Sequence, residues 1–211
     1  MAKQLDIDTW ARKEHFHFFR NFEEPFFGFT TEVDCTGAYA YCSKNNISFF
    51  LYYLYLSLKT ANEMDCFHYR IKGENVLIHE RIDASPTINR PDGTFGFSYV
   101  HYHEDFDQFV LEANKEIERV RKGKDLLPAL SGENVIHYSA IPWIRFTSMS
   151  HARSFSHQDS CPKITMGKMC EVNQRKVMPV SVHAHHALMD GSDIGAYLQR
   201  YQQLLSHGLN D

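Results

Sequence analysis

The segment Val180–Gly191 concentrates residue types that can do chemistry. It reads Val-Ser-Val-His-Ala-His-His-Ala-Leu-Met-Asp-Gly. Side chains of a strand alternate between its two faces, so His186 shares the apolar face of this segment, whereas His183 and His185 point the other way. We expect His186 at the end of that strand, just before a turn at Asp190-Gly191. A neutral imidazole in this position keeps a free ring nitrogen, as a general base working near pH 7 requires.

Three other interpretations of this segment stay open on these residues alone. His186 could be a core histidine with satisfied hydrogen bonds, followed by an ordinary turn. The histidines and Asp190 could bind a metal ion, but strand geometry separates His183 and His185 from His186, so we expect no metal. Catalysis by a serine nucleophile would need a Gly-x-Ser-x-Gly elbow, which the sequence lacks.

The elements that must position these residues can be predicted from periodicity. Apolar residues recur at helical spacing over 106–120, which predicts a helix that packs with one face. Residues 45–64 form an apolar segment longer than a typical strand, and we predict a buried helix there. A short amphipathic helix is expected within 10–19, with Asp8 or Thr9 as its N-cap.

The sequence pattern of the C-terminal half predicts several strands, followed by a last helix. Ser192 is expected to cap that helix, and Gly208 to stop it. Helices alternating with strands of different length favour an α+β or mixed α/β layer architecture. The predicted strands are 135–147, 164–172 and 176–186, with a turn at Asn173-Gln174 between the last two.

Composition and charge narrow the class of protein. The 211 residues suit one domain over 1–211, and no Gly/Ser/Pro-rich linker divides them. A net charge of −4 argues against a nucleic-acid-binding protein. The five cysteines include no Cys-x-x-Cys pair, so we expect neither a zinc site nor a disulfide framework. The N-terminal residues lack the apolar core of a signal peptide, and the apolar run 47–58 is too short to span a membrane, so we expect a cytoplasmic protein.

The spacing His186-x-x-x-Asp190-Gly191 is the signature shared by the chloramphenicol acetyltransferases and the catalytic domains of dihydrolipoamide acyltransferases. Three further segments, in the same order along the chain, resemble chloramphenicol acetyltransferase motifs: Trp10–Phe16, Tyr138–Trp143 and Ile164–Lys168. The sequence is thus similar to this family over nearly its whole length. The resemblance implies a two-layer α/β sandwich with a mixed sheet covered by helices. It also implies acetyl-CoA as co-substrate and a homotrimer whose active sites lie between subunits.

The resemblance further implies catalytic roles, position by position. His186 takes the proton from an acceptor hydroxyl, which then attacks the acetyl thioester. Ser139 donates a hydrogen bond to the tetrahedral oxyanion, and Thr165 positions an assisting water. Asp190 pairs with Arg12 and so holds the turn that aims His186.

Residues for both substrates are implied in the same way. Lys168 matches a lysine that lines the coenzyme site, and Trp143 matches an aromatic residue nearby. Phe18 and Phe19 match an aromatic pair in the acceptor pocket, and His137 stands where acceptor contacts are expected. The family therefore suggests chloramphenicol as the acceptor and antibiotic resistance as the outcome, with no nucleic-acid or membrane partner.

The pockets depart from the family pattern more than the catalytic residues do. The family's Lys-Phe-Tyr-Pro segment is replaced by Ser48–Leu51, which removes a basic residue near the expected nucleotide end of the coenzyme. Glu23 and Glu24 follow the aromatic pair, and Asp159 and Lys163 stand where family members have aromatic or aliphatic residues. Two alternatives are therefore kept: an acetyltransferase for a different hydroxyl acceptor, and a non-catalytic ligand-binding relative. We expect no transfer to a lipoyl group, because the sequence holds no lipoyl domain or linker.

Overall fold

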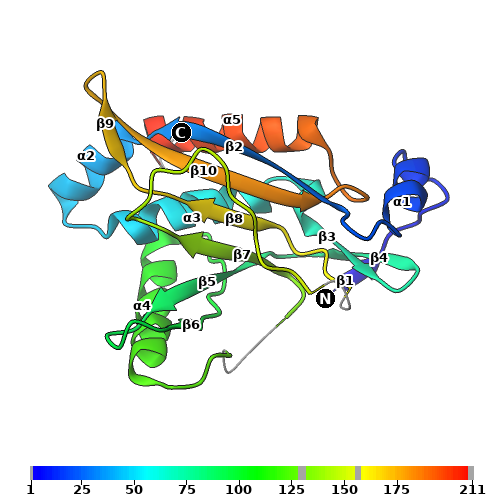
Figure 1. Ribbon diagram of the computed structural model, residues 1–211, viewed down its shortest axis with the longest axis horizontal. Helices are drawn as coiled ribbons and strands as arrows, with labels where there is room; N and C mark the ends of the chain where they lie inside the picture. The colour runs from blue at the N-terminus through cyan, green and yellow to red at the C-terminus, as the bar shows by residue number, and fades with distance from the viewer. Residues whose placement is uncertain (1, 128–131, 155–157, 209–211) are drawn as a thin grey trace.

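A mixed β-sheet runs through the centre of the structure, a computed structural model that describes residues 2–127, 132–154 and 158–208 (Figure 1). Within these residues the strand order is β2 (Phe26–Asp34), β10 (Arg175–His185), β8 (Lys163–Met166), β7 (Val135–Ala140), β5 (Asp83–Asn89) and β6 (Phe95–Phe97). Strands β5, β7 and β8 are parallel to one another. The pairs β2–β10, β10–β8 and β5–β6 are antiparallel. The predicted α/β architecture with a mixed sheet is confirmed.

A tight hairpin joins β9 (Cys170–Val172) to β10. Its turn residues Asn173 and Gln174 have φ angles of 50° and 64°. Two-residue hairpin loops require this left-handed region, which asparagine tolerates better than most residues. The predicted turn is confirmed.

Two predicted strands are shorter than expected. The strand expected over 135–147 ends at Ala140. Pro142 follows shortly after and has no N–H to donate to a neighbouring strand. The strand expected over 164–172 is divided into β8 and β9, because the chain leaves the sheet around Gly167. The pattern of apolar and polar residues along the sequence could not show where these two predicted strands end.

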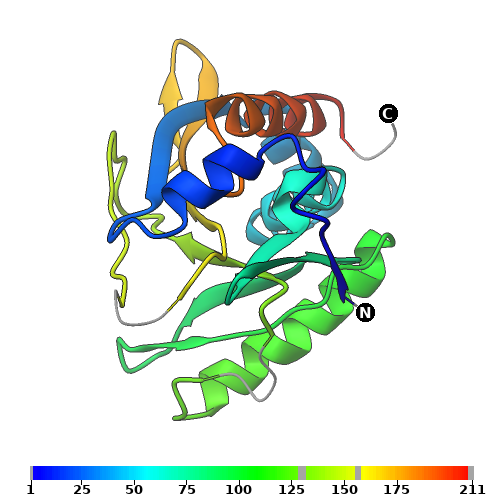
Figure 2. The same cartoon turned by 90° about the vertical axis from the view of Figure 1, so that its right-hand side faces the viewer.

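Three helices cover one face of the sheet, while the segment 141–154 lies on the other (Figure 2). The helices are α2 (Thr36–Asn45), α3 (Phe49–Asn62) and α5 (Gly191–His207). Most residues of α3 are buried, which explains its apolar sequence. The hydroxyl oxygen of its buried Ser57 lies 3.0 Å from the hydroxyl of Tyr138 and 2.5 Å from that of Tyr197. These contacts satisfy the polar group and tie α3 to β7 and α5.

The predicted helix over 106–120 is present as α4 (Phe106–Lys122). Asp105 is its N-cap, and the Asp105 carboxylate accepts a hydrogen bond from the backbone N–H of Gln108 at 2.7 Å. The helix packs against β5, β6 and α3. Its buried residues Phe109 and Ala113 fall on the face that the periodicity predicted.

The predicted N-cap of the first helix is wrong. The helix α1 (Lys13–Phe19) begins after Arg12, not after Asp8 or Thr9. The carboxylate of Asp6 accepts hydrogen bonds from the Asp8 backbone and from the Thr9 hydroxyl, at 3.1 and 3.0 Å. These residues therefore form a turn that precedes the helix.

The predicted N-cap of the last helix is also displaced, from Ser192 to Asp190. The Asp190 carboxylate accepts from the Ser192 backbone at 2.9 Å, and the Asp193 carboxylate accepts from the Asp190 backbone at 2.8 Å. This reciprocal capping box leaves Ser192 inside the first turn. The stop at Gly208 is confirmed by its φ of 86°.

A second, smaller core supports the turn that carries His186. Strands β1 (Ala2–Gln4), β4 (Asn75–His79) and β3 (Tyr69–Lys72) form a separate sheet. The 3-10 helix η1 (Asp65–His68) leads directly into β3. The buried residues of this core are Phe16, Ile71, Val76, Ala187 and Leu188. Two of them directly follow His186, so burial holds the turn in place.

None of the helices within the described ranges is both long and apolar enough to cross a membrane.

Candidate active site

The His186 ring is held in one orientation and one tautomer. It lies one residue beyond β10, where its backbone N–H donates to the Pro25 carbonyl at 2.8 Å. The ring stacks on Phe19 with centroids 4.0 Å apart and lies tilted against Phe27 with centroids 4.4 Å apart. Its Nδ1 lies 3.3 Å from the carbonyl oxygen of Met189. Because a carbonyl oxygen can only accept, Nδ1 carries the hydrogen, and Nε2 keeps a lone pair that can take a proton.

Arg12 and Asp190 form the pair that the resemblance implied. An Arg12 guanidinium nitrogen lies 2.7 Å from the Asp190 carboxylate, and a second one donates to the His186 carbonyl at 3.1 Å. Hydrogen bonds from Ser192 and Arg12 hold the pKa of Asp190 well below its usual range, so the carboxylate is charged. The pair thus links α1, the His186 turn and the N-terminus of α5.

Ser139 and Thr165 are neighbours across the sheet. They are Cα partners on β7 and β8, and Ser181 of β10 continues the row on the same face. Thr165 is fully buried, and its hydroxyl oxygen lies 3.5 Å from Nε2 of His151 in the covering segment 141–154. The row presents hydroxyl groups on the face opposite the helices.

The same chain does not bring His186 to this row. His186 follows Ser181 by five positions along β10. At about 3.3 Å of rise per residue, this places it about 16 Å from the row of Ser139 and Thr165. The general base and the oxyanion donor implied by the resemblance are therefore in separate places within one protomer.

A second row on the same face carries His137, Lys163 and His183, again as Cα partners on three strands. Burial, together with the nearby Lys163 ammonium, lowers the pKa of His137 to about 4. The His183 ring lies over Gly28, where a Cβ atom would come within 2.5 Å of it. Glycine at this position of β2 is what allows the histidine to lie against the sheet.

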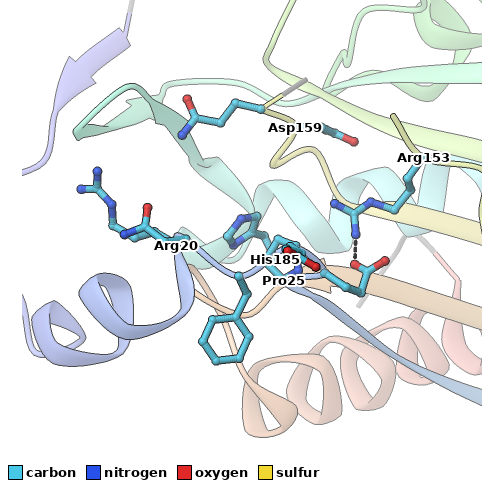
Figure 3. Close-up of a pocket in the computed structure, with 10 residues that line it drawn as sticks. Arg20, Pro25, Arg153, Asp159 and His185 are labelled. Carbon is cyan, nitrogen blue, oxygen red and sulfur yellow. Dashed lines mark ion pairs between the residues drawn. The ribbon is translucent and has the colours of Figure 1, made fainter. Parts of the chain in front are cut away.

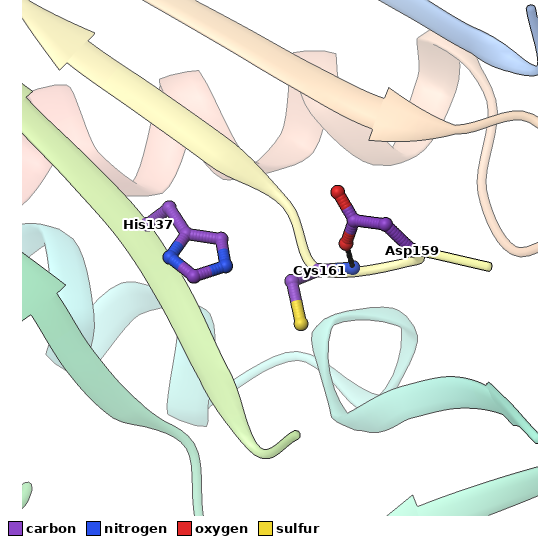
Figure 4. A group of neighbouring side chains, drawn as sticks. All are labelled: His137, Asp159 and Cys161. Atoms are coloured by element: carbon purple, nitrogen blue, oxygen red, sulfur yellow. Dashed lines mark hydrogen bonds between the residues drawn. The ribbon is translucent and has the colours of Figure 1, made fainter. Parts of the chain in front are cut away.

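His137 also approaches two residues of the segment before β8 (Figure 4). The candidate metal-ligand atoms of His137, Asp159 and Cys161 lie within 4.8 Å of one another. Lys163 pairs with the Asp159 carboxylate, and the Arg70 guanidinium is fully buried nearby. A cation bound here would face two fixed positive charges, which opposes metal binding.

A cavity of about 720 Å³ opens beside the His186 turn (Figure 3). Arg20, Pro25 and His185 line one side, and Arg153 and Asp159 line the other. Its wall includes Pro25, whose carbonyl accepts from the backbone N–H of His186, and His185, whose side chain points away from the face of the His186 ring. Arg153 and His151 come from a segment without strong periodicity, which is why sequence reasoning missed both.

The candidate coenzyme residues are brought together by Gly167. A Cβ atom there would lie 2.9 Å from the Ile144 carbonyl oxygen, which accepts from the Lys168 backbone at 2.8 Å. The Trp143 side chain is 59% exposed and that of Lys168 is also exposed. Both side chains are therefore open to a ligand.

A cleft of about 480 Å³ lies next to the Ser139 strand end. It is bounded by Ser48 and Phe50 at the start of α3 and by Ala140 and Pro142 after Ser139. Arg121 of α4 also lines it. The sequence indicated that a basic residue is missing near Ser48, and only the tertiary structure reveals a cation from another element in the same cleft.

The chain resembles known proteins over nearly its whole length. A sequence profile described as chloramphenicol acetyltransferase matches residues 2–202. The chain is 28% identical to chloramphenicol acetyltransferase 3 of Escherichia coli over 208 residues, which cover 98% of each protein. It is 26% identical to a chloramphenicol acetyltransferase of Proteus mirabilis over 205 residues, which cover 97% of this chain and 94% of that one.

Solved structures extend the comparison to the fold. A chloramphenicol acetyltransferase superposes with a TM-score of 0.89 at 32% identity and covers 97% of this chain and 100% of its own. The cubic core of the pyruvate dehydrogenase multienzyme complex shares the fold, with a TM-score of 0.65 at 16% identity over 87% of this chain and 82% of that one. With its four sequence motifs in order and a profile match over nearly all its residues, the chain belongs to the chloramphenicol acetyltransferase family of acyltransferases.

Proposed function

We propose that this protein transfers an acetyl group from acetyl-CoA to the hydroxyl group of a small acceptor, with chloramphenicol as the acceptor suggested by its relatives. The observation that carries the proposal is the contact of the His186 ring with Met189, whose carbonyl oxygen lies 3.3 Å from Nδ1. Its Nδ1–H donates to the Met189 carbonyl, so Nε2 is available as a base. The stacked ring of Phe19 keeps that base in place.

The proposed reaction is a direct transfer between two bound substrates. Nε2 of His186 removes the proton of the acceptor hydroxyl, and the oxygen attacks the thioester carbonyl carbon. The tetrahedral intermediate then collapses, the carbon–sulfur bond breaks, and the coenzyme thiolate takes the proton from the imidazolium. The products are the acetyl ester and coenzyme A, with His186 returned to its neutral form. A positioned base of this kind contributes about 10²–10⁴ in rate.

Ser139 is the proposed donor to the oxyanion, and Thr165 the residue that positions an assisting water. Their row lies about 16 Å from His186 along β10 of the same protomer, and this separation supports a site completed by a second copy of the chain. We propose a homotrimer in which one protomer supplies His186 and its neighbour supplies Ser139 and Thr165. Each chain, as one domain over 1–211, then takes part in two sites.

The substrate sites follow from the surrounding residues. Lys168 and Trp143 are proposed to bind acetyl-CoA, and their exposed, adjacent positions support this. Phe18 and Phe19 are proposed to contact the acceptor together with His137. Phe18 is 64% exposed and packs edge-on against Phe19, with ring centroids 4.9 Å apart. A cytoplasmic location and chloramphenicol resistance of the host cell are corollaries of this proposal.

The proposal is tested by measuring thiol release from acetyl-CoA with chloramphenicol and with a panel of other alcohols. We expect release to depend on the acceptor, and the His186→Gln variant to lose at least about 10²-fold in kcat. His207→Gln, an exposed histidine at the end of α5, serves as the matched control. Full turnover by His186→Gln would refute the assignment of the base, and tight coenzyme binding without turnover of any acceptor would favour a non-catalytic relative.

Shared active sites are tested by mixing two inactive variants. Co-expression of His186→Gln with Ser139→Ala produces mixed trimers in which some interfaces hold one intact residue from each chain. Random assembly predicts about a quarter of wild-type activity per site. Activity that stays at the level of either variant alone, or a monomer by light scattering, would overturn the shared site.

A further inference from the structure

Arg121 faces a cleft and has no anionic partner among the residues that the structure describes. It lies in the last turn of α4 and lines the cleft of about 480 Å³ at the end of the Ser139 strand. The neighbouring cations of the same turn, Arg119 and Lys122, pair with carboxylates of their own helix. Arg121 makes no hydrogen bond or ion pair to any described residue. Its charge is therefore free to meet a ligand.

The rest of the cleft lining is uncharged. Among the described residues that form it, none is an aspartate or a glutamate, and Arg121 is its basic residue. The other polar side chains of the lining are neutral: Ser48, Tyr53, Thr87, Asn89 and Asn114. An anion in the cleft would therefore meet one positive charge and several hydrogen-bonding groups, without a carboxylate in the lining to repel it.

The spacing of residues on α4 places Arg121 at the cleft. Asn114, Ile117 and Arg121 follow one another at intervals of three and four residues, so their side chains share one face of the helix. The start of α3 contributes Phe49 and Phe50 to the same cleft, and both rings are partly exposed. Aromatic rings can stack with a nucleotide base, and a guanidinium suits a phosphate. The cleft thus combines the two kinds of group that recognise a nucleotide.

The cleft begins at the residues that follow the proposed oxyanion donor. Ala140 and Pro142 line it, Ala140 comes directly after Ser139, and Pro142 comes directly before Trp143. The parallel strands β5 and β7 both end here, β5 at Asn89 of the lining (Figure 1). Sheets of this kind bind ligands outside the carboxyl ends of their parallel strands. A ligand that reacts near Ser139 can therefore extend its other end into the cleft.

We propose that Arg121 binds a phosphate group of acetyl-CoA in this cleft. The inference rests on the proposed function and assigns a binding residue for the anionic end of its co-substrate. Coenzyme A carries its phosphates at the end remote from the thiol, so its phosphates lie away from the thioester that reacts near Ser139. The planar donors of the guanidinium match two phosphate oxygens at once. Arg121 of α4 then supplies the positive charge that Ser48 does not.

The experiment compares acetyl donors that lose their phosphates in steps. The donors are acetyl-CoA, acetyl-dephospho-CoA without the 3′-phosphate, and S-acetylpantetheine without any phosphate, each with chloramphenicol as acceptor. Arg121→Gln should raise the KM of acetyl-CoA by about tenfold or more, the effect of one charge-assisted hydrogen bond. Its kcat should change by less than about twofold, because the phosphate contact is the same in the ground state and the transition state. With S-acetylpantetheine, kcat/KM should change by less than about threefold.

Further arms identify the phosphate and control for charge. A KM effect that disappears with acetyl-dephospho-CoA assigns Arg121 to the 3′-phosphate, and one that persists assigns it to the diphosphate; both results support the inference. Lys122→Gln is the matched control, because Lys122 is the next cation of α4, is exposed and pairs with Glu118. We expect its KM for acetyl-CoA to stay within about twofold of the wild type. Arg121→Lys keeps the charge and should recover part of the affinity.

The inference is overturned if Arg121→Gln leaves the KM of acetyl-CoA unchanged, or if S-acetylpantetheine loses the same factor. Equal losses in Arg121→Gln and Lys122→Gln would also reject it, since the net charge of the helix would then be the cause. Each of these results leaves acetyl transfer, and so the proposed function, in place. If the wild type acetylates no alcohol, the proposed function fails, and calorimetric titration with coenzyme A then tests the phosphate contact by itself. Equal affinity of the wild type and Arg121→Gln for coenzyme A would reject the contact.

Discussion

Arg12 and Asp190, 178 positions apart in the sequence, meet at 2.7 Å, and the same guanidinium donates to the carbonyl oxygen of His186. The contact fastens the first helix to the turn that carries the candidate base. Asp190 is also the N-cap of α5, so a single carboxylate holds a helix end and an arginine together.

Replacing Asp190 by asparagine separates these two functions. Asparagine caps helices as well as aspartate does, so the free energy of unfolding should fall by less than about 1 kcal/mol. The lost charge pair with Arg12 should lower kcat by about tenfold, because the His186 turn is held less firmly. Asp190→Ala should cost about 1 kcal/mol more in stability, from the lost cap. Urea unfolding and steady-state kinetics measure both effects.

The pairing itself is tested by Arg12→Met combined with Asp190→Asn. Substitutions of two residues in one contact do not have additive effects, so the double variant should lose about as much kcat as Arg12→Met alone, which already removes the guanidinium from both Asp190 and the His186 carbonyl. Losses that multiply would show that Arg12 and Asp190 act independently.

Removing the hydroxyl of Ser139 should lower kcat by about 10²–10³ with little change in KM, since an oxyanion donor acts in the transition state. Ser181→Ala is the matched control, because Ser181 lies in the same row of the sheet. We expect its kcat to stay within about threefold of the wild type. Equal effects of the two variants would contradict a special role for Ser139.

Two adjacent phenylalanines should respond differently to truncation. Phe19 stacks on the His186 ring with an interplanar angle of 13°, so Phe19→Leu should lower kcat by about three- to tenfold. Phe18 has no contact of this kind and is 64% exposed, so Phe18→Leu should raise the KM of the acceptor instead. Kinetics with varied acceptor concentration separate the two effects, and a lower kcat in Phe18→Leu alone would reverse the assignment.

Stability should fall as pH decreases from about 6.5 to about 4. Burial lowers the pKa of His137, His151 and His185 to about 4 in the folded protein, whereas unfolded histidines titrate near 6.5. The unfolded chain therefore binds protons first, and the histidine contribution to the free energy of unfolding is lost through this range and stays constant below it. His185, only 4% exposed, contributes on the order of 2–3 kcal/mol.

The variant His185→Asn isolates this contribution. The His185 Nδ1 accepts from the Ala187 backbone at 3.2 Å, and the amide oxygen of asparagine can replace that acceptor. Urea unfolding at pH 7.5, 6.0 and 4.5 should give a flatter pH dependence for this variant than for the wild type. His207→Asn should leave the dependence unchanged, and an unchanged slope in His185→Asn would show that His185 does not cause it.

Local signals determined much of this protein from the sequence alone. The helices α3 and α4 follow from apolar length and from a 3.6-residue period, and the turn at Asn173-Gln174 follows from turn chemistry. The motif around His186, together with the segments that resemble the chloramphenicol acetyltransferases, pointed to the family that the comparisons identify. Such features depend on residues that are close together in the sequence, so they can be predicted without knowledge of the tertiary structure.

Only the tertiary structure decided which residues meet. The N-caps at Arg12 and Asp190 differ from the expected ones because nearby residues compete for the same local hydrogen bonds: the Thr9 hydroxyl donates to the Asp6 carboxylate, and the Asp190 backbone donates to the Asp193 carboxylate. The rows that join Ser139 to Thr165 and His137 to Lys163 depend on register between strands, which no single segment encodes. The pairing of distant segments also determines the separation between His186 and Ser139. It likewise places Arg153 in the cavity wall. These contacts join residues that are far apart in the sequence. The pairing of the strands and the burial of the core determine them jointly.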